Sequence, residues 1–403
     1  MTIVSGGSVW FMGVQRGEKS PGAEGLQLLN LTSDELFRTA QQTFYTLAHK
    51  RRCTIDKRCY LCCRQSVTNK NTSDMRQTLI LLSSALLLIV VMGAGSHLNA
   101  QGGRHGEQAE HGNPTNAIYH WKTLFNPSAE ELAFIQRHDI RRLYVRMFDV
   151  ALLENNQGVI VPAPIATTRF EEPIPEGVEV IPTTYITLEA LKAMRDDESY
   201  YAELIVDRLM AMASYNECGT IKEVQFDCDW TPSTTDIYYT LCDHAEAYLN
   251  EMGIDLSITV RLHQIDDGHA PKADRGVLML YNTGAVKSFK TRNSILDITD
   301  IKPYLSNVGY PLPLDFAYPT FSWGVLFRNG VFQGLVSDPE RATLGEGETL
   351  REERVSAEEI LTAKEWVESA IGLPYQSNII YHLDYTELNN YTDDEISKIY
   401  SRN

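Results

Sequence analysis

From about residue 116 onward, short strand-like runs alternate with helical stretches. In each run, apolar positions recur at every second residue or form a short block bounded by turn residues. Eight strands are predicted, at 117–123, 143–150, 180–187, 223–230, 256–264, 276–282, 314–320 and 378–385. Helices are predicted between most of them, and Ser128, Ser356 and Thr392 each begin a capping box that Glu completes three residues later.

Strands that alternate with helices pair in parallel, and eight of them in one domain indicate an α/β fold, a closed (β/α)8 TIM barrel. An open doubly wound sheet is the alternative, although no Gly-rich phosphate loop follows the first strand. Residues 151–177 are rich in Pro and Asn and predict an extended loop after strand 2. Asn329 and Gly330, between two β-rich arms, predict a β-hairpin insertion after strand 7. Both insertions border the C-terminal face of the barrel, where active sites of this fold lie.

One face of the fourth predicted strand is polar and the other is apolar. The polar set is Gln225, Asp227, Asp229 and Thr231. The apolar set suits the helix layer, so the polar set is expected inside the barrel. Carboxylates there are costly unless they serve chemistry or are neutralised. Two readings stay open: Asp227 pairs with Arg146 or Arg261 for structure alone, or the aspartates belong to an active site.

Two short motifs resemble those of family 18 glycoside hydrolases, the chitinase-like barrels. FDCDWT on the fourth strand is similar to their D-x-x-D-x-D-x-E signature, and MLYN at 279–282 is similar to M-x-Y-D on their sixth strand. The resemblance implies that Asp227 and Asp229 are the two middle aspartates, that Tyr281 helps to hold a substrate N-acetyl group, and that Asn282 stands at the adjoining carboxylate position.

The sequence departs from that signature at both ends. Val224 stands at the first Asp position, and Thr231 stands where the proton-donating Glu is expected. A hydroxyl cannot replace a carboxylic acid in that role. The run RLYVRMFDV and the ending NIIYHLDYTELNNY also resemble uncharacterised secreted barrel proteins of gut-type bacteria.

The candidate catalytic residues are therefore Asp229, Asp227, Tyr281 and Asp149, with Asp149 the preferred replacement for the missing acid. Other carboxylates near strand ends are Asp266, Asp267, Asp315 and Asp384. The predicted substrate-binding residues are Asn282, His263, Gln264, Tyr318, Trp323 and Trp121. Aromatic rings stack on sugar faces, and Trp323 is the preferred platform. No cofactor or metal is predicted, since His263 has no second His at metal spacing.

The segment 75–100 predicts a secretory signal peptide, with Arg76 before an apolar run and small residues after it. The run at 79–92 is shorter than the ~20 residues of a membrane span, so a membrane contact is expected only if the segment is uncleaved. Residues 1–74 are interpreted as an upstream extension foreign to the native protein, 101–115 as a flexible lead-in, and 116–403 as the barrel. A secreted or periplasmic location follows.

The net charge of −17 argues against nucleic acid as a partner, because phosphate backbones would be repelled. The sequence thus predicts a secreted glycoside hydrolase-like barrel acting on a glycan or oligosaccharide. The alternative is a non-catalytic glycan-binding barrel that has lost its proton-donor carboxylate.

Overall fold

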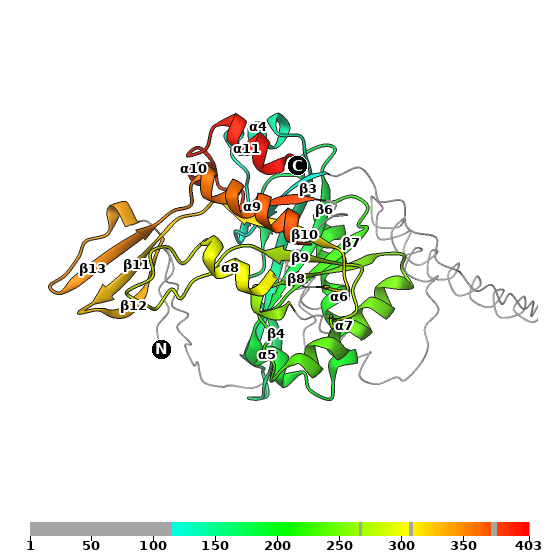
Figure 1. The fold of residues 1–403 in the computed structure, drawn as a ribbon. Coiled ribbons are helices and arrows are strands. Elements are labelled where there is room, and N and C mark those ends of the chain that lie inside the picture. The colour runs from blue at the N-terminus through cyan, green and yellow to red at the C-terminus, as the bar shows by residue number, and fades with distance from the viewer. Residues whose placement is uncertain (1–114, 266–267, 306–308, 338, 372–376, 403) are drawn as a thin grey trace, which may run out of the picture. The chain divides into compact units, whose positions relative to one another are not determined.

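Eight parallel strands form a closed barrel in the computed structural model (Figure 1). The structure describes residues 115–265, 268–305, 309–337, 339–371 and 377–402, which belong to a compact unit spanning His105–Asn403. The predicted extension, signal peptide and lead-in, up to residue 114, lie outside the described residues. The barrel strands are β1 (Asn116–His120), β3 (Ile140–Glu154), β6 (Glu179–Ile186), β7 (Glu223–Asp227), β8 (Asp255–Val260), β9 (Arg275–Met279), β10 (Leu314–Pro319) and β14 (Asn378–Tyr381). Because β14 and β3 both pair with β1, the ring closes and the predicted (β/α)8 fold is confirmed.

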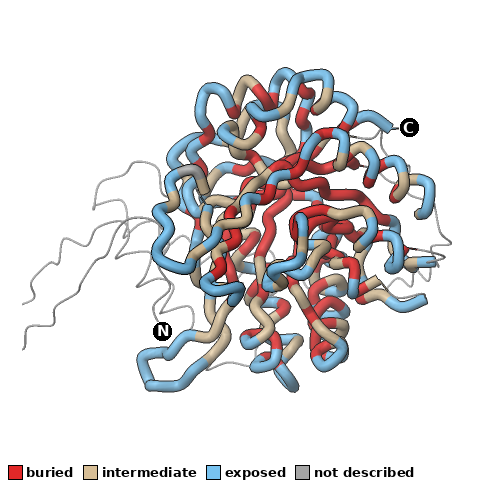
Figure 2. The backbone as a smooth tube through the Cα atoms, turned by 60° about the vertical axis from the view of Figure 1, so that its left-hand side comes forward, coloured by how far each residue is buried: buried red, intermediate tan, exposed pale blue. Residues whose placement is uncertain are grey.

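Helices cover the outside of the ring. They are α4 (Ala129–Arg137), α5 (Leu188–Ala193), α6 (Glu198–Tyr215), α7 (Thr235–Asn250), α8 (Ile298–Leu305), α9 (Ala357–Ile371), α10 (Tyr385–Leu388) and α11 (Asp393–Tyr400). The capping boxes at Ser128, Ser356 and Thr392 are confirmed, each hydroxyl accepting from the backbone N–H of the Glu three residues on. Buried residues concentrate on the strands and on the helix faces turned toward them (Figure 2). Within the described ranges, no helix is long and apolar enough to cross a bilayer.

The connection after β3 is a β-hairpin rather than the extended loop that its composition predicts. β3 continues to Glu154 and pairs antiparallel with β4 (Ile160–Ile165). The carboxamide of Asn155 accepts from the backbone N–H groups of Gln157 and Val159 at 2.9 and 3.0 Å, and this turn reverses the chain. A second short pairing, β5 (Arg169–Phe170) with β2 (Leu124–Phe125), joins this connection to the loop after β1.

The hairpin predicted after strand 7 is confirmed. β11 (Trp323–Arg328) and β12 (Val331–Val336) are joined by Asn329 and Gly330 with φ of 50° and 77°, as a type I′ turn requires. β13 (Glu348–Glu353) pairs with the other edge of β11, which makes a three-stranded sheet that projects beside the barrel (Figure 1). The buried carboxylate of Glu353 fixes its base, accepting from Trp323 Nε1 at 2.8 Å and from the Ser294 backbone N–H at 2.9 Å.

The fourth and fifth barrel strands end earlier than predicted, at Asp227 and Val260. A 3₁₀ turn over Leu262–Gln264 follows β8. The side-chain amide of Gln264 donates to the carbonyls of Cys228 and Trp230 at 3.0 and 3.1 Å. The Gln264 side chain therefore takes the place of a neighbouring strand as hydrogen-bond donor to these carbonyls. The backbone leaves the strand pairing of the barrel at Asp227.

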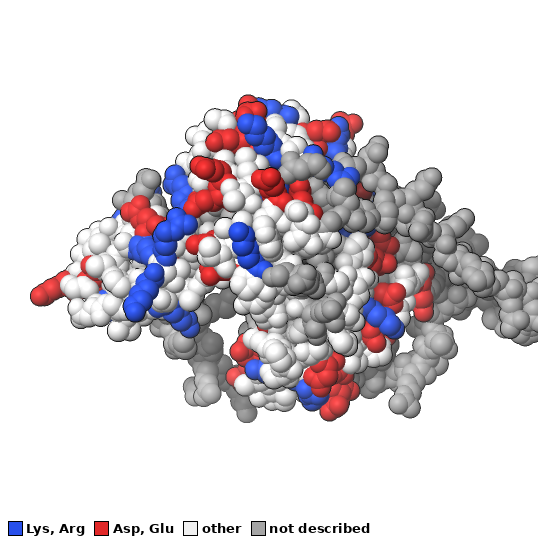
Figure 3. All heavy atoms as spheres, in the orientation of Figure 1, with Lys and Arg blue, Asp and Glu red and all other residues white. Residues whose placement is uncertain are grey.

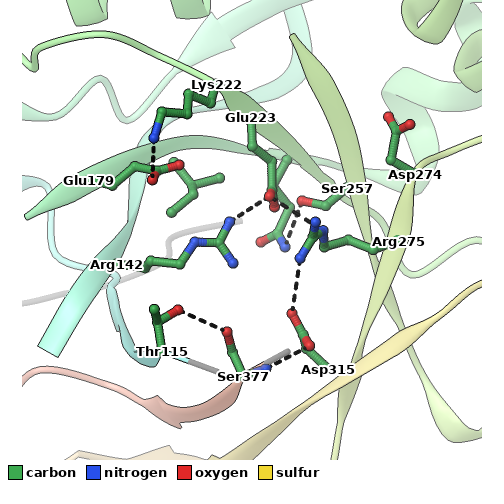
Figure 4. Close-up of polar contacts among 12 residues, drawn as sticks. Thr115, Arg142, Glu179, Lys222, Glu223, Ser257, Asp274, Arg275, Asp315 and Ser377 are labelled. Atoms are coloured by element: carbon green, nitrogen blue, oxygen red, sulfur yellow. Dashed lines mark hydrogen bonds and ion pairs between the residues drawn. The ribbon is translucent and has the colours of Figure 1, made fainter. Parts of the chain in front are cut away.

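Buried charges fill the barrel near the beginnings of its strands (Figure 4). Arg142 Nη2 lies 2.5 Å from Glu223 Oε2, and Arg275 Nε lies 3.5 Å from the same oxygen. Arg275 Nη1 also lies 3.8 Å from Asp315 Oδ2. Asp315 is thus at the N-terminal end of β10, in an ion-pair network, and the interpretation of Asp315 as a carboxylate at the catalytic end of its strand is wrong.

Candidate functional site

A cavity of about 200 Å³ opens at the C-terminal ends of β7, β8 and β9. Its lining consists of Asp229, Arg261, Leu262, His263, Tyr281, Asn282, Thr283 and Tyr304. Four predicted site residues therefore meet there: Asp229, His263, Tyr281 and Asn282. This is the face on which barrel enzymes carry their active sites.

Arg261 holds the two aspartates of the fourth strand together. Its Nε donates to Asp229 Oδ1 at 2.5 Å, and its Nη2 donates to Asp227 Oδ1 at 3.2 Å. Asp227 also accepts from the Thr259 hydroxyl at 2.5 Å. These contacts place Asp227 inside the ring, facing Thr259 and Arg261, as the alternation of polar and apolar residues predicts.

The two aspartates have different surroundings. The side chain of Asp227 is 3% exposed and that of Asp229 is 44% exposed. Burial raises the pKa of Asp227; the Arg261 guanidinium opposes this rise, and the charge of Asp229 adds to it. Burial also raises the pKa of the Tyr281 hydroxyl, so Tyr281 is a neutral phenol at physiological pH. Among the described residues that line the cavity, Asp229 is the one carboxylate, and it is already paired with a cation.

Aromatic rings form the wall beside the cavity. The ring of Tyr381, on β14, lies 4.7 Å from that of Tyr281 and 5.7 Å from that of Trp121. Phe321 bridges Tyr381 to Trp323, with centroid distances of 5.8 and 5.2 Å. Trp121 and Trp323 are partly buried. The indole N–H of Trp323 donates a hydrogen bond to the carboxylate of Glu353, so this predicted sugar-stacking residue also anchors the β11–β13 sheet.

Asp149, the predicted acid, does not line the cavity and is paired with Arg146. Both of its oxygens accept from Arg146, with Nε to Oδ1 at 2.6 Å, and Arg146 also donates to the carbonyl of Trp121 at 3.3 Å. A two-pronged pair of this kind orients both side chains strongly. Its geometry is typical of a structural ion pair at the edge of the aromatic wall.

Three other predicted residues lie away from the cavity lining. Gln264 is buried and bonded to backbone carbonyls, so its contacts position the end of β7. Tyr318 is fully buried and lies an odd number of residues from Asp315 on β10, which places it on the opposite, helix-facing side of the strand. Asp384 caps α10, accepting from Thr386 N–H at 3.0 Å, and lies 3.3 Å from Lys122 Nζ. Asp266 and Asp267 lie outside the described residues.

The structure adds two site residues that the sequence did not single out for function. Arg261 is predicted only as a partner of Asp227, whereas it lines the cavity and binds both aspartates. Tyr381 joins Trp121 to Tyr281, and its inward direction could have been deduced only from the register of β14 with its neighbours. Among the described residues, no group of three or more His, Cys, Asp or Glu side chains is placed to hold a metal ion.

No protein-family profile and no curated protein sequence matches the chain. Similar solved structures include a chitinase from Chromobacterium violaceum, 10% identical with a TM-score of 0.47, the match covering 71% of this chain and 98% of that one. The spore cortex-lytic enzyme of Bacillus cereus is 15% identical with a TM-score of 0.46, with coverages of 79% and 82%. A family 18 chitinase of Flavobacterium johnsoniae is 11% identical with a TM-score of 0.41, with coverages of 67% and 87%. The predicted resemblance to chitinase-like barrels agrees with these matches. At such identities and TM-scores, function has to be argued from the site itself.

Proposed function

We propose that this glycoside hydrolase-like barrel binds a glycan at the mouth of the ring and does not cleave it. The observation that carries the proposal is the pairing of Asp229 with Arg261 at 2.5 Å, which neutralises the exposed carboxylate of the cavity. In the substrate-assisted cleavage of chitinase-like barrels the substrate N-acetyl group is the nucleophile, so the protein must supply one carboxylic acid that delivers a proton. Asp227 and Asp229 instead share one guanidinium, and Thr231 stands at the donor position of the motif.

Glycan binding is supported by the composition of the site. A partly exposed aromatic wall stands beside polar groups that can hydrogen-bond hydroxyls, namely Asp229, Asn282 and His263. Sugar sites combine these two features, since the C–H face of a pyranose stacks on a ring while its hydroxyls need directional partners. Export from the cytoplasm is part of the proposal and rests on the signal-like segment 75–100.

Hydrolysis is the second candidate function, and one observation favours it. Asp227 and Asp229 are adjacent carboxylates, and burial raises the pKa of Asp227. When two carboxyl groups in one site have different pKa values, one can act as the acid and the other as the base. In that case Asp229 would orient the substrate, and a further carboxyl group would supply the proton.

The test measures retention on immobilised polysaccharides and release of reducing ends by the same full-length protein. Asn282→Gly is the informative variant, because Asn282 lines the cavity with φ of 56° and glycine keeps that backbone conformation while removing the side chain. Asn329→Gly is the matched control, since Asn329 has φ of 50° in the β11–β12 turn and does not line the cavity. The proposal predicts retention that weakens in Asn282→Gly, stays unchanged in Asn329→Gly, and is accompanied by no reducing ends.

If the wild type releases reducing ends and Asp229→Asn does not, the protein is a hydrolase and the proposal of binding without cleavage is rejected. Equal retention by Asn282→Gly and the wild type would place the glycan elsewhere on the protein.

A further inference from the structure

The loop that leaves the cavity is closed at its base. After Asn282 and Thr283, which line the cavity, the backbone N–H of Gly284 donates to the carbonyl of Ser294 at 3.2 Å. A Cβ on Gly284 would lie 3.1 Å from the Asn293 carbonyl and from Ser294 Cα, a tight contact, so the close approach of the two ends favours a residue without a side chain. Residues 284–294 therefore form a compact Ω-type loop directly beside the proposed glycan site.

Arg351 of β13 fixes the conformation of this loop. Its Nη1 donates to the carbonyl of Ser288 at 2.7 Å and its Nη2 donates to that of Val286 at 3.1 Å. The loop also bonds internally, with Ser288 N–H donating to the Ala285 carbonyl at 2.9 Å. The base of the loop is tied to the residue that follows β13, because Asn293 Nδ2 donates to the carbonyl of Arg354 at 2.9 Å. These hydrogen bonds hold the backbone of the loop, and therefore the positions from which the side chains at its tip project.

That tip is basic and carries an aromatic ring. The sequence from 284 to 294 contains Lys287, Lys290 and Arg292 and no acidic residue, in a chain whose net charge is −17. Lys287 and Lys290 are exposed, and Arg292 is 72% exposed beside two carboxylates, Glu359 at 3.3 Å and Asp297 at 3.7 Å. Phe289 between them is 56% exposed and packs edge-on against Phe327 with ring centroids 5.1 Å apart. Figure 3 shows Lys and Arg side chains where the projecting sheet meets the barrel, with Asp and Glu side chains among them.

The positive charge of the patch rests on Lys287 and Lys290, since two carboxylates lie beside Arg292. At physiological ionic strength the Debye length is about 8 Å, so a ligand on the loop responds mainly to charges within that range. A polymer that carried regular negative charges would be attracted at the loop and could stack a ring on Phe289. A neutral polymer would gain only the stacking contact.

We propose that the glycan is anionic, carrying carboxylate or sulfate groups, and that it extends from the cavity across residues 287–292. This inference rests on the proposed function and specifies its ligand class. Lys287 and Lys290 attract the negative groups of the glycan, while the cavity holds one of its sugar residues. Loss of these lysines should weaken binding without altering the cavity.

The experiment uses the full chain with polygalacturonate, dextran sulfate and neutral dextran, each at low and high salt. Lys287→Gln with Lys290→Gln is the test variant, and Lys192→Gln with Lys272→Gln, on α5 and before β9, is a control that removes the same charge from exposed positions elsewhere. We expect binding to one or both anionic polymers to exceed binding to dextran, to weaken with salt, and to fall on the order of tenfold in the test variant only.

Each other outcome overturns the inference in a recognisable way. Equal binding of dextran and the anionic polymers that still depends on Asn282 would reject the anionic ligand and leave the proposed glycan site intact. Equal weakening in both lysine variants would show that the effect is one of net charge and not of the loop. Binding of vesicles that contain phosphatidylserine, with no binding of the polymers, would assign the patch to a lipid surface. Binding of no polysaccharide of either charge, in these arms and on the immobilised panel, would remove the proposed function together with this inference.

Discussion

Arg261 Nε lies 2.5 Å from Asp229 Oδ1 at the mouth of the barrel, and the same guanidinium reaches 3.2 Å from Asp227 one layer deeper. One cation thus serves an exposed and a buried carboxylate at once. The deeper pair is enclosed, since the Asp227 side chain is 3% exposed and that of Arg261 is 16% exposed.

Removing Arg261 should destabilise the protein in a pH-dependent manner. Arg261→Gln leaves Asp227 buried without its cation, and breaking a buried pair on one side costs about 3–5 kcal/mol. The raised pKa of Asp227 means that the native state holds its proton to a higher pH than the unfolded chain does. Stability of the variant should therefore fall as pH rises above about 4 and level off above the native pKa. Denaturant unfolding from pH 4 to 8 measures this.

The double variant Arg261→Gln with Asp227→Asn provides the check on that prediction. It removes both charges, so we expect it to recover a substantial part of the lost stability at pH 7. If the two substitutions simply add, the pair contributes no coupling and the assigned role of Arg261 is refuted.

His120 should make the barrel sensitive to mild acid. It is 2% exposed at the end of β1, and burial lowers its pKa to about 4. Between pH 6.5 and 4 the unfolded chain binds a proton that the native state does not, so stability is complete above pH 6.5 and is lost as pH falls toward 4. A shift of this size corresponds to about 3 kcal/mol. Thermal unfolding of His120→Phe should show a shallower decline over this range than the wild type. The exposed His244→Gln serves as control, and an identical decline in all three proteins would contradict the prediction.

The ion pairs near the beginnings of the strands should contribute to the stability of the protein in proportion to their burial. Arg142 and Glu223 have side chains 10% and 3% exposed, whereas the neighbouring pair of Lys222 and Glu179 is 70% and 27% exposed. We expect Glu223→Gln to cost about 3–5 kcal/mol, because it leaves Arg142 and Arg275 without their shared carboxylate. Glu179→Gln should cost less than about 1 kcal/mol. Urea unfolding of the two variants at pH 7 compares them, and equal costs would show that the network is not stabilised by its enclosure.

The barrel could be predicted from sequence because eight strand-like runs alternate with helical stretches, and the inward face of the fourth strand could be predicted because its polar and apolar residues alternate. Asp227 falls on the inward face in that pattern, and its hydrogen bonds to Thr259 and Arg261 in the structure agree. The same alternation gave no help for Tyr318, since LDFAYP is buried on both faces and its register decides which side chains point inward.

The parts that could not be predicted depend on contacts between distant segments. The end of β7 is set by Gln264, which lies beyond the next barrel strand and bonds the carbonyls of Cys228 and Trp230. The antiparallel extension of β3 depends on Asn155 forming its turn, within a stretch whose Pro and Asn content is equally typical of a loop. Arg261 could be recognised as a partner of Asp227, but its second bond to Asp229 follows only from where both strands stop.

Hydrogen–deuterium exchange of the full chain, with and without the polysaccharide that it retains most strongly, tests the central claim most directly. Glycan binding at the mouth of the ring predicts slower exchange of backbone amides at 261–264 and 280–284, next to Arg261, Tyr281 and Asn282, with no release of reducing ends in the same samples. Unchanged exchange in both segments while another surface becomes protected, or cleavage of the glycan during the measurement, would contradict the account.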